Sequence, residues 1–144
     1  MIAADANLIA QLVLEHNQTE LARAIYQRDP NWVMPELWRH ELLNVLANHC
    51  RFKKVSYDKL LVAWQHAITL FADSVKPVDM PLALKIAGER NVTAYDAQYL
   101  VLAKTLDIPL VTEDRKLRQA APDLTLSMQA FLSSTTIKYN GLMS

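Results

Sequence analysis

The chain begins with the stretch "MIAADANLIA", residues 1–10, which has the pattern of a strand followed by a helix. A short apolar run stops at Asp5, and the residues that follow Asn7 place Leu8 and Leu12 on one face at helical spacing. This pattern predicts a buried strand of about four residues that ends at Asp5 and leads into a helix. A buried strand followed directly by a helix is typical of an α/β fold.

The rest of the chain repeats this alternation. We expect further short strands at residues 32–34, 74–78, 108–112 and 124–127. Helices are expected between and after them, over residues 7–15, 18–28, 35–50, 56–71, 79–90, 93–106, 114–120 and 128–132. Short apolar strands that alternate with helices predict a mainly parallel sheet of four or five strands, covered by helices on both faces.

Length and composition favour one globular domain. The chain has 144 residues, of which 51% are hydrophobic and 21% are charged. We expect a single domain over residues 1–132 and a polar tail over residues 133–144. The chain has only two glycines, which argues against a Gly-rich phosphate-binding loop and against a turn-dense all-β fold.

The charge balance and the single cysteine exclude several classes of function. Fifteen basic and fifteen acidic residues give a formal charge of zero, so only a local patch could attract a polyanion. Cys50 is the only cysteine, which excludes a disulfide framework and a cysteine-based metal site. The sequence has neither the pattern of a signal peptide nor an apolar run of membrane-spanning length, so a cytoplasmic, soluble protein is expected.

Two acidic residues follow predicted strands. Asp5 ends the first strand, and Asp114 follows the strand at 108–112. Ligands in parallel α/β folds bind outside the carboxyl ends of the strands, so both acids are candidate site residues. Each also has a simpler interpretation, because Asp5 could form an Asx turn and Asp114 could cap the helix that follows it.

Two more acidic residues lie on predicted helices. Asp96 stands three residues after Thr93, which is the N3 position of a capping box, but it shares a helix face with Leu100. Glu41 is expected in the middle of the helix at 35–50, where it caps nothing and has no basic neighbour at helical spacing. Glu41 therefore has the weakest structural explanation of the four acids.

Four carboxylates that converge without cations would repel one another strongly. One or two divalent metal ions would remove this repulsion, and oxygen ligands favour Mg²⁺ or Mn²⁺ over zinc or copper. Such ions activate water and stabilise the charge that develops when a phosphodiester is cleaved. The four acids together therefore indicate a metal-dependent phosphoesterase.

Four segments of the chain, read together, resemble a known family. They are "IAADANLIA" with Asp5, "ELLNVL" with Glu41, "TAYDAQYLVLA" with Asp96, and "LVTEDRKL" with Asp114. In their order and spacing they resemble the PIN-domain proteins, in particular the VapC-like ribonuclease toxins of bacterial toxin–antitoxin modules. The resemblance covers residues 1–132.

The resemblance implies a three-layer α/β/α sandwich and cleavage of RNA that depends on Mg²⁺ or Mn²⁺. It further implies that the domain forms homodimers and is inhibited by a small antitoxin protein. Carried over to this chain, it places Asp5, Glu41, Asp96 and Asp114 in an acidic metal site. We expect the three aspartates to bind the metal, directly or through water, and Glu41 to orient or deprotonate the attacking water. The resemblance also assigns supporting roles to the polar residues Asn7 and Thr112.

Two basic clusters could bind RNA. Arg51 and Lys53 follow the predicted Glu41 helix, and Arg115 and Lys116 follow Asp114 directly. Neutralisation of phosphates supplies most of the affinity for nucleic acids, so both clusters are candidate substrate contacts. Each cluster could also be a solvated helix end, but the position of Arg115 and Lys116 beside Asp114 favours substrate contact.

Other functions stay open at this point. "HELLN" at 40–44 resembles the zinc-protease pattern H-E-x-x-H, but Asn44 replaces the second histidine. A phosphoryl-accepting receiver domain would carry adjacent acids at the end of its first strand, where this chain has Asp5 alone. The remaining alternatives are a DNA nuclease, another Mg²⁺-dependent phosphoesterase, and a catalytically silent binding module.

Overall fold

The sheet is parallel and has four strands. The structure, a computed structural model, describes residues 1–14 and 19–134. The strands run in the order β2-β1-β3-β4, and each neighbouring pair is parallel. Their bounds are Ile2–Ala4 for β1, Trp32–Val33 for β2, Leu110–Val111 for β3 and Thr125–Leu126 for β4. The three residues of β1 are fully buried, so β1 is the centre of the core.

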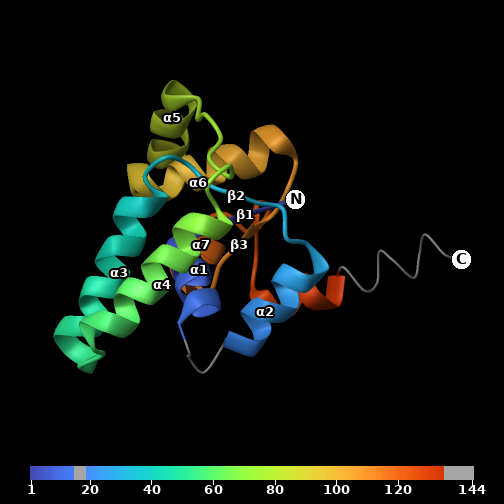
Figure 1. The fold of residues 1–144 in the computed structure, drawn as a ribbon. Helices are drawn as coiled ribbons and strands as arrows, with labels where there is room; N and C mark the ends of the chain where they lie inside the picture. Colours follow the sequence, from blue (N-terminus) through green and yellow to red (C-terminus); the bar gives the residue numbers. More distant parts are fainter. Residues whose placement is uncertain (15–18, 135–144) are drawn as a thin grey trace, which may run out of the picture.

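Helices cover the sheet on both sides (Figure 1). Helix α1 contacts α2, α3 and α4, whereas α5 contacts α6, and α6 packs on β1 and β3. The three-layer α/β/α class predicted from the sequence is thereby confirmed, with four strands. The helices are α1 Ala6–Val13, α2 Thr19–Arg28, α3 Trp38–Lys53, α4 Tyr57–Leu70, α5 Met80–Arg90, α6 Ala94–Leu106 and α7 Arg115–Ala120, and residues 128–134 are also helical.

Side-chain caps fix the beginnings of three helices where the sequence predicted them. Ser56, Asp79 and Thr93 are the N-caps of α4, α5 and α6. Each accepts a hydrogen bond from the backbone N–H three residues later, at 3.4, 3.1 and 3.0 Å respectively. These bonds satisfy backbone donors that have no partner within the helix.

Two predicted elements differ in the structure. Residues 74–78 do not form a strand, because only Val75 pairs, in a single parallel bridge to Met34, and Pro77 has no N–H to extend the ladder. The helix expected from Pro35 begins instead at Trp38, because residues 35–38 form a turn in which the Trp38 N–H donates to the Pro35 carbonyl. Of the predicted tail, residues 135–144 lie outside the described residues.

An aromatic cluster anchors β2 to the helices. Trp32 stacks on Phe71 at a centroid distance of 5.3 Å, and Trp38 meets the same ring edge-on at 6.1 Å. Both tryptophans are 1% exposed. Aromatic pairs in these arrangements stabilise the core beyond the area that they bury.

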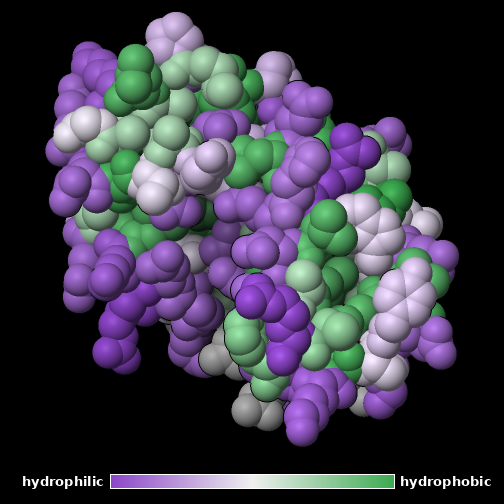
Figure 2. Space-filling model, turned by 90° about the vertical axis from the view of Figure 1, so that its left-hand side faces the viewer, coloured by the Kyte–Doolittle hydropathy of each residue, from purple (hydrophilic) through white to green (hydrophobic). Residues whose placement is uncertain are grey.

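One face of the molecule carries two hydrophobic areas that are separated by hydrophilic residues (Figure 2). The face in Figure 2 is hollowed between two areas rich in hydrophobic side chains, and hydrophilic residues occupy the space between them.

No helix in the described parts of the chain combines the length and the apolar character that crossing a membrane requires.

Candidate functional site

All four acids predicted from the sequence line one cleft of about 730 Å³. Asp5 follows β1, and Asp114 follows β3, the strand that pairs with β1 in parallel. Because adjacent parallel strands end at the same edge of a sheet, these two carboxylates arrive side by side. Glu41 comes from α3 and Asp96 from α6, so four different parts of the chain contribute one acid each.

Asp5 is held by two hydrogen bonds. Its Oδ1 accepts from the Leu8 N–H at 2.9 Å, and its Oδ2 accepts from the Thr112 hydroxyl at 2.5 Å. The first bond makes Asp5 the N-cap of α1, so the simpler interpretation is correct as well. The Thr112 oxygen also accepts from the Asp114 N–H at 3.1 Å, and it therefore connects the acids at the ends of β1 and β3.

The partner of Glu41 is a buried tyrosine. The Tyr99 hydroxyl donates to Glu41 Oε1 at 2.6 Å. Tyr99 lies on α6 and is 1% exposed. The prediction that Glu41 is mid-helix is wrong, because α3 begins at Trp38 and Glu41 belongs to its first turn. The helix dipole favours a carboxylate there.

Asp96 and Asp114 both lie at helix N-termini. Asp96 stands at N3 of α6, where its N–H donates to the Thr93 hydroxyl at 3.0 Å. Asp114 is the N-cap of α7 and accepts from the Leu117 N–H at 3.0 Å. The cap predicted for Asp114 is present, whereas at Asp96 the cap is the Thr93 side chain. Both carboxylates line the cleft.

The surroundings disfavour negative charge on three of these acids. Desolvation raises the pKa of Asp5 to about 6, against the lowering effect of its hydrogen bonds from Thr112 and Leu8. Desolvation is also the main cause that raises the pKa of Glu41 and that of Asp96. Repulsion among the acids adds to each effect, since Asp5 and Glu41 both feel the charge of Asp96, and Asp96 feels that of Asp114.

No lysine or arginine is among the described residues that line this cleft. The other side chains with hydrogen-bonding groups are Asn7, His40, Asn44, Asn48, Tyr95 and Tyr99. A site rich in carboxylate oxygens and poor in cations has the chemistry that a hard divalent ion prefers. Within the described residues, however, no three Asp, Glu, His or Cys side chains already form a metal-coordinating group.

The four basic candidates lie in different places. Lys53 lines a second cavity next to the acidic cleft, whereas Arg51 lines an apolar groove between α3 and α4 and lies over the Phe52 ring at 4.6 Å. Arg115 and Lys116 are exposed at the start of α7. The structure thus brings one of the four, Lys53, to a cavity that borders the acids.

Two residues of the cleft were missed in the sequence. Tyr99 was not singled out from the helix predicted at residues 93–106, and His40 was considered only as a zinc ligand. The signal for Tyr99 was its position three residues after Asp96, which puts both on one face of α6. His40 precedes Glu41 and lines the cleft as an exposed side chain.

Comparison with known proteins identifies the family. The family model that describes the PIN domain matches residues 2–122. The chain therefore belongs to the PIN domain family, as its four sequence segments predicted.

One curated relative and several solved structures are similar over most of the chain. The chain is 30% identical over 128 residues to Ribonuclease VapC3 from Pyrobaculum aerophilum, covering 85% of this chain and 96% of the relative. The crystal structure of PAE2754 from the same organism superposes with a TM-score of 0.72 at 21% identity, covering 94% of this chain and 96% of that one. That of FitAcB from Neisseria gonorrhoeae has a TM-score of 0.67 at 20% identity, with coverages of 90% and 99%.

Proposed function

We propose that this protein is a divalent-metal-dependent endoribonuclease and the toxin of a toxin–antitoxin pair. The main support for the proposal is that Asp5, Glu41, Asp96 and Asp114 line one cleft. The family, together with the similarity to a protein named as a ribonuclease, supports RNA as the substrate class.

The acids would hold Mg²⁺ or Mn²⁺, with Asp5, Asp96 and Asp114 as the ligands, directly or through water. Mg²⁺ keeps several of its waters in protein sites, so a looser set of carboxylates can bind it. A bound ion there would neutralise the mutual repulsion of the acids and stabilise negative charge on the scissile phosphate. The raised pKa values of Asp5 and Asp96 support this assignment, because such carboxylates gain most from a nearby cation.

Glu41 would act as the general base. Its carboxylate accepts a proton from a water molecule as the water oxygen attacks phosphorus, and the bond from phosphorus to the leaving ribose oxygen breaks. The leaving oxygen then takes a proton from solvent. Because burial raises the pKa of Glu41, its carboxylate is a better proton acceptor than an exposed one.

Two residues would position the acids. Tyr99 fixes the rotamer of Glu41 through its 2.6 Å hydrogen bond, and Thr112 fixes Asp5 through a bond of 2.5 Å. Asn7, in the first turn of α1, reaches the same cleft and would contact substrate or metal-bound water. Arg51, Lys53, Arg115 and Lys116 would contact RNA phosphates outside the acidic cleft.

The partners remain proposals. A small antitoxin and a second copy of this chain are both expected from the family, and the apolar groove between α3 and α4 offers a surface suited to a protein contact. The cytoplasmic location remains a prediction from the sequence. Light scattering of the full chain, alone and with the product of any neighbouring short gene, would measure both associations.

The direct test is cleavage of a panel of structured RNAs by Glu41→Gln, which keeps the shape of the side chain and removes its charge. We expect the rate in Mg²⁺ to fall by at least about 100-fold, because general-base catalysis typically contributes that much. Glu89→Gln, on the exposed face of α5, is the matched control and should cleave like the parent. Equal rates for Glu41→Gln and the parent would show that Glu41 is not the base, and cleavage of DNA alone would show that RNA is the wrong substrate.

A further inference from the structure

A second cavity borders the acidic cleft and has no role in the chemistry above. It has a volume of about 390 Å³ and shares Asn7, Val45 and Asp114 with the acidic cleft. Its volume is within the range of 300–1,000 Å³ that is typical of sites for small organic groups. An RNA strand with one phosphate among the acids can therefore place the adjoining nucleotide in this cavity.

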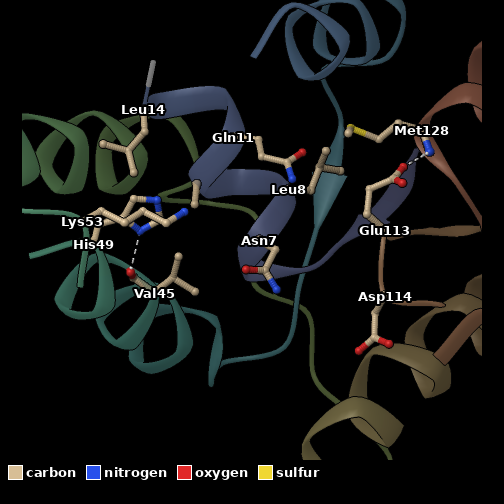
Figure 3. A pocket seen from close by; sticks show the side chains of 11 residues that line it. Asn7, Leu8, Gln11, Leu14, Val45, His49, Lys53, Glu113, Asp114 and Met128 are labelled. Atoms are coloured by element: carbon tan, nitrogen blue, oxygen red, sulfur yellow. Dashed lines mark hydrogen bonds between the residues drawn. The ribbon is translucent and has the colours of Figure 1, made fainter. Parts of the chain in front are cut away.

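The cavity combines an apolar wall with amide groups. Leu8, Leu14, Val45 and Met128 supply apolar surface, and two side-chain amides come from Asn7 and Gln11 on α1. Figure 3 shows these amides between His49 and Lys53 on one side and Glu113 and Met128 on the other. Flat heteroaromatic rings with polar edges suit such walls, because the faces need apolar contact and the edges need donors and acceptors.

The side-chain oxygen of Gln11 lacks a hydrogen-bond donor among the described residues. This oxygen, Oε1, is also buried. A buried acceptor without a donor destabilises the folded state, so a ligand that supplies a donor gains from the pairing. The amide carries both an acceptor and donors, and rotation about its last side-chain bond can exchange their positions.

Of the described residues, the cavity wall carries one lysine, Lys53, and two carboxylates, Glu113 and Asp114. Glu113 does not present a free carboxylate, because its Oε1 accepts from the Met128 N–H at 2.7 Å and its Oε2 lies 3.4 Å from Arg118 Nη1. Lys53, in the last turn of α3, places an ammonium on the cavity wall. An adjacent phosphate could be neutralised there.

We propose that this cavity binds one unpaired base of the RNA next to the scissile phosphate, with the Gln11 amide distinguishing between bases and Lys53 contacting the neighbouring phosphate. The inference rests on the proposed function, since it takes the acidic cleft as the place where RNA is cut. Gln11 sets which base is accepted, whereas Lys53 raises affinity for every base equally.

The test is a titration of the full-length Glu41→Gln protein with each of the four ribonucleoside 5′-monophosphates, once in Mg²⁺ and once in EDTA. The NMR signals of the side-chain amides report binding. We expect the Gln11 signals to shift and the four affinities to span about tenfold, the discrimination that one hydrogen bond to a base edge supplies. Gln11→Ala should reduce that span to within about twofold, and the isosteric Gln11→Glu should change the order of preference. Lys53→Ala should weaken all four, and Gln27→Ala, on the exposed side of α2, should change nothing.

The outcomes separate this inference from the proposed function. A parent protein that does not cleave RNA in Mg²⁺, or Glu41→Gln titrations that are identical in Mg²⁺ and in EDTA, would count against the metal site alone. Unshifted Gln11 signals, or an unchanged base preference in Gln11→Ala, would overturn the base-binding cavity. An arginine-containing hexapeptide that shifts the Gln11 signals, where none of the nucleotides does, would identify a peptide site and would also overturn it.

Discussion

The Tyr99 hydroxyl donates a 2.6 Å hydrogen bond to Glu41 Oε1, and this bond joins α6 to the first turn of α3 across the acidic cleft. Tyr99 is almost wholly buried, and this burial is the main cause that raises the pKa of its phenol. The charge of Glu41 and the hydrogen bond to it raise that pKa further. The phenol therefore stays protonated and remains a donor. One rigid side chain thus sets the direction of the proposed base.

Removal of this donor should slow the reaction without unfolding the protein. Tyr99→Phe keeps the ring and deletes the hydroxyl, so we expect kcat to fall about tenfold with KM nearly unchanged, because only the orientation of the base is lost. The free energy of unfolding should fall by about 1–2 kcal/mol. Single-turnover cleavage and urea unfolding measure the two effects, with Tyr57→Phe on the surface of α4 as the control. A variant that cleaves at the parent rate would show that Tyr99 does not position Glu41.

The second positioning bond joins Thr112 to Asp5. Thr112→Val keeps the shape but removes both the donor to Asp5 and the acceptor for the Asp114 N–H. We expect the free energy of unfolding to fall by about 1–3 kcal/mol, because two partly buried hydrogen bonds are lost. Thr112→Ser retains the hydroxyl and should recover most of the loss. Equal stability of the valine and serine variants in urea would contradict this account.

Asp5 should make the metal-free protein less stable as the pH rises. Its pKa is raised from 3.8 to about 6, so folding favours the protonated acid. The resulting stabilisation is complete below pH 3.8 and is lost as the pH rises through about 6. In EDTA, Asp5→Asn, which can still cap α1, should therefore gain about 1–3 kcal/mol over the parent at pH 7 and nothing at pH 3.5.

Thermal and urea unfolding at a series of pH values would measure this difference. Asp73→Asn, at an exposed position, is the matched control and should follow the parent at every pH. If Asp5→Asn gained the same free energy of unfolding at pH 3.5 and at pH 7, ionisation of Asp5 would not be what destabilises the folded protein.

The sequence predicted the parts of the site that depend on local order along the chain. Asp5 and Asp114 follow adjacent parallel strands, so their meeting follows from the strand–helix alternation alone. Asp96 was predicted from the helix face that it shares with Leu100 and from the segment "TAYDAQYLVLA". These parts of the site could be predicted because they depend on residues close in sequence or on the rule that adjacent parallel strands end at the same edge of a sheet.

The parts that sequence could not supply depend on how distant elements pack. The bond from Tyr99 to Glu41 joins residues 58 positions apart, and nothing in either helix pattern specifies the other. The start of α3 was misplaced because the turn at residues 35–38 has the same apolar spacing as the helix after it. Arg51 was grouped with Lys53 by sequence, but the rotation between them on α3 directs one to the α3–α4 groove and the other to the second cavity.

The proposed function requires that the carboxylates of Asp5, Asp96 and Asp114 bind a divalent metal ion. Anomalous diffraction from crystals of the full chain soaked in Mn²⁺ would locate such an ion. We predict a Mn²⁺ peak in the acidic cleft, about 2–2.5 Å from an oxygen of at least one of the three acids, and its loss in Asp96→Asn. Saturating Mn²⁺ with no peak between these carboxylates would contradict the account.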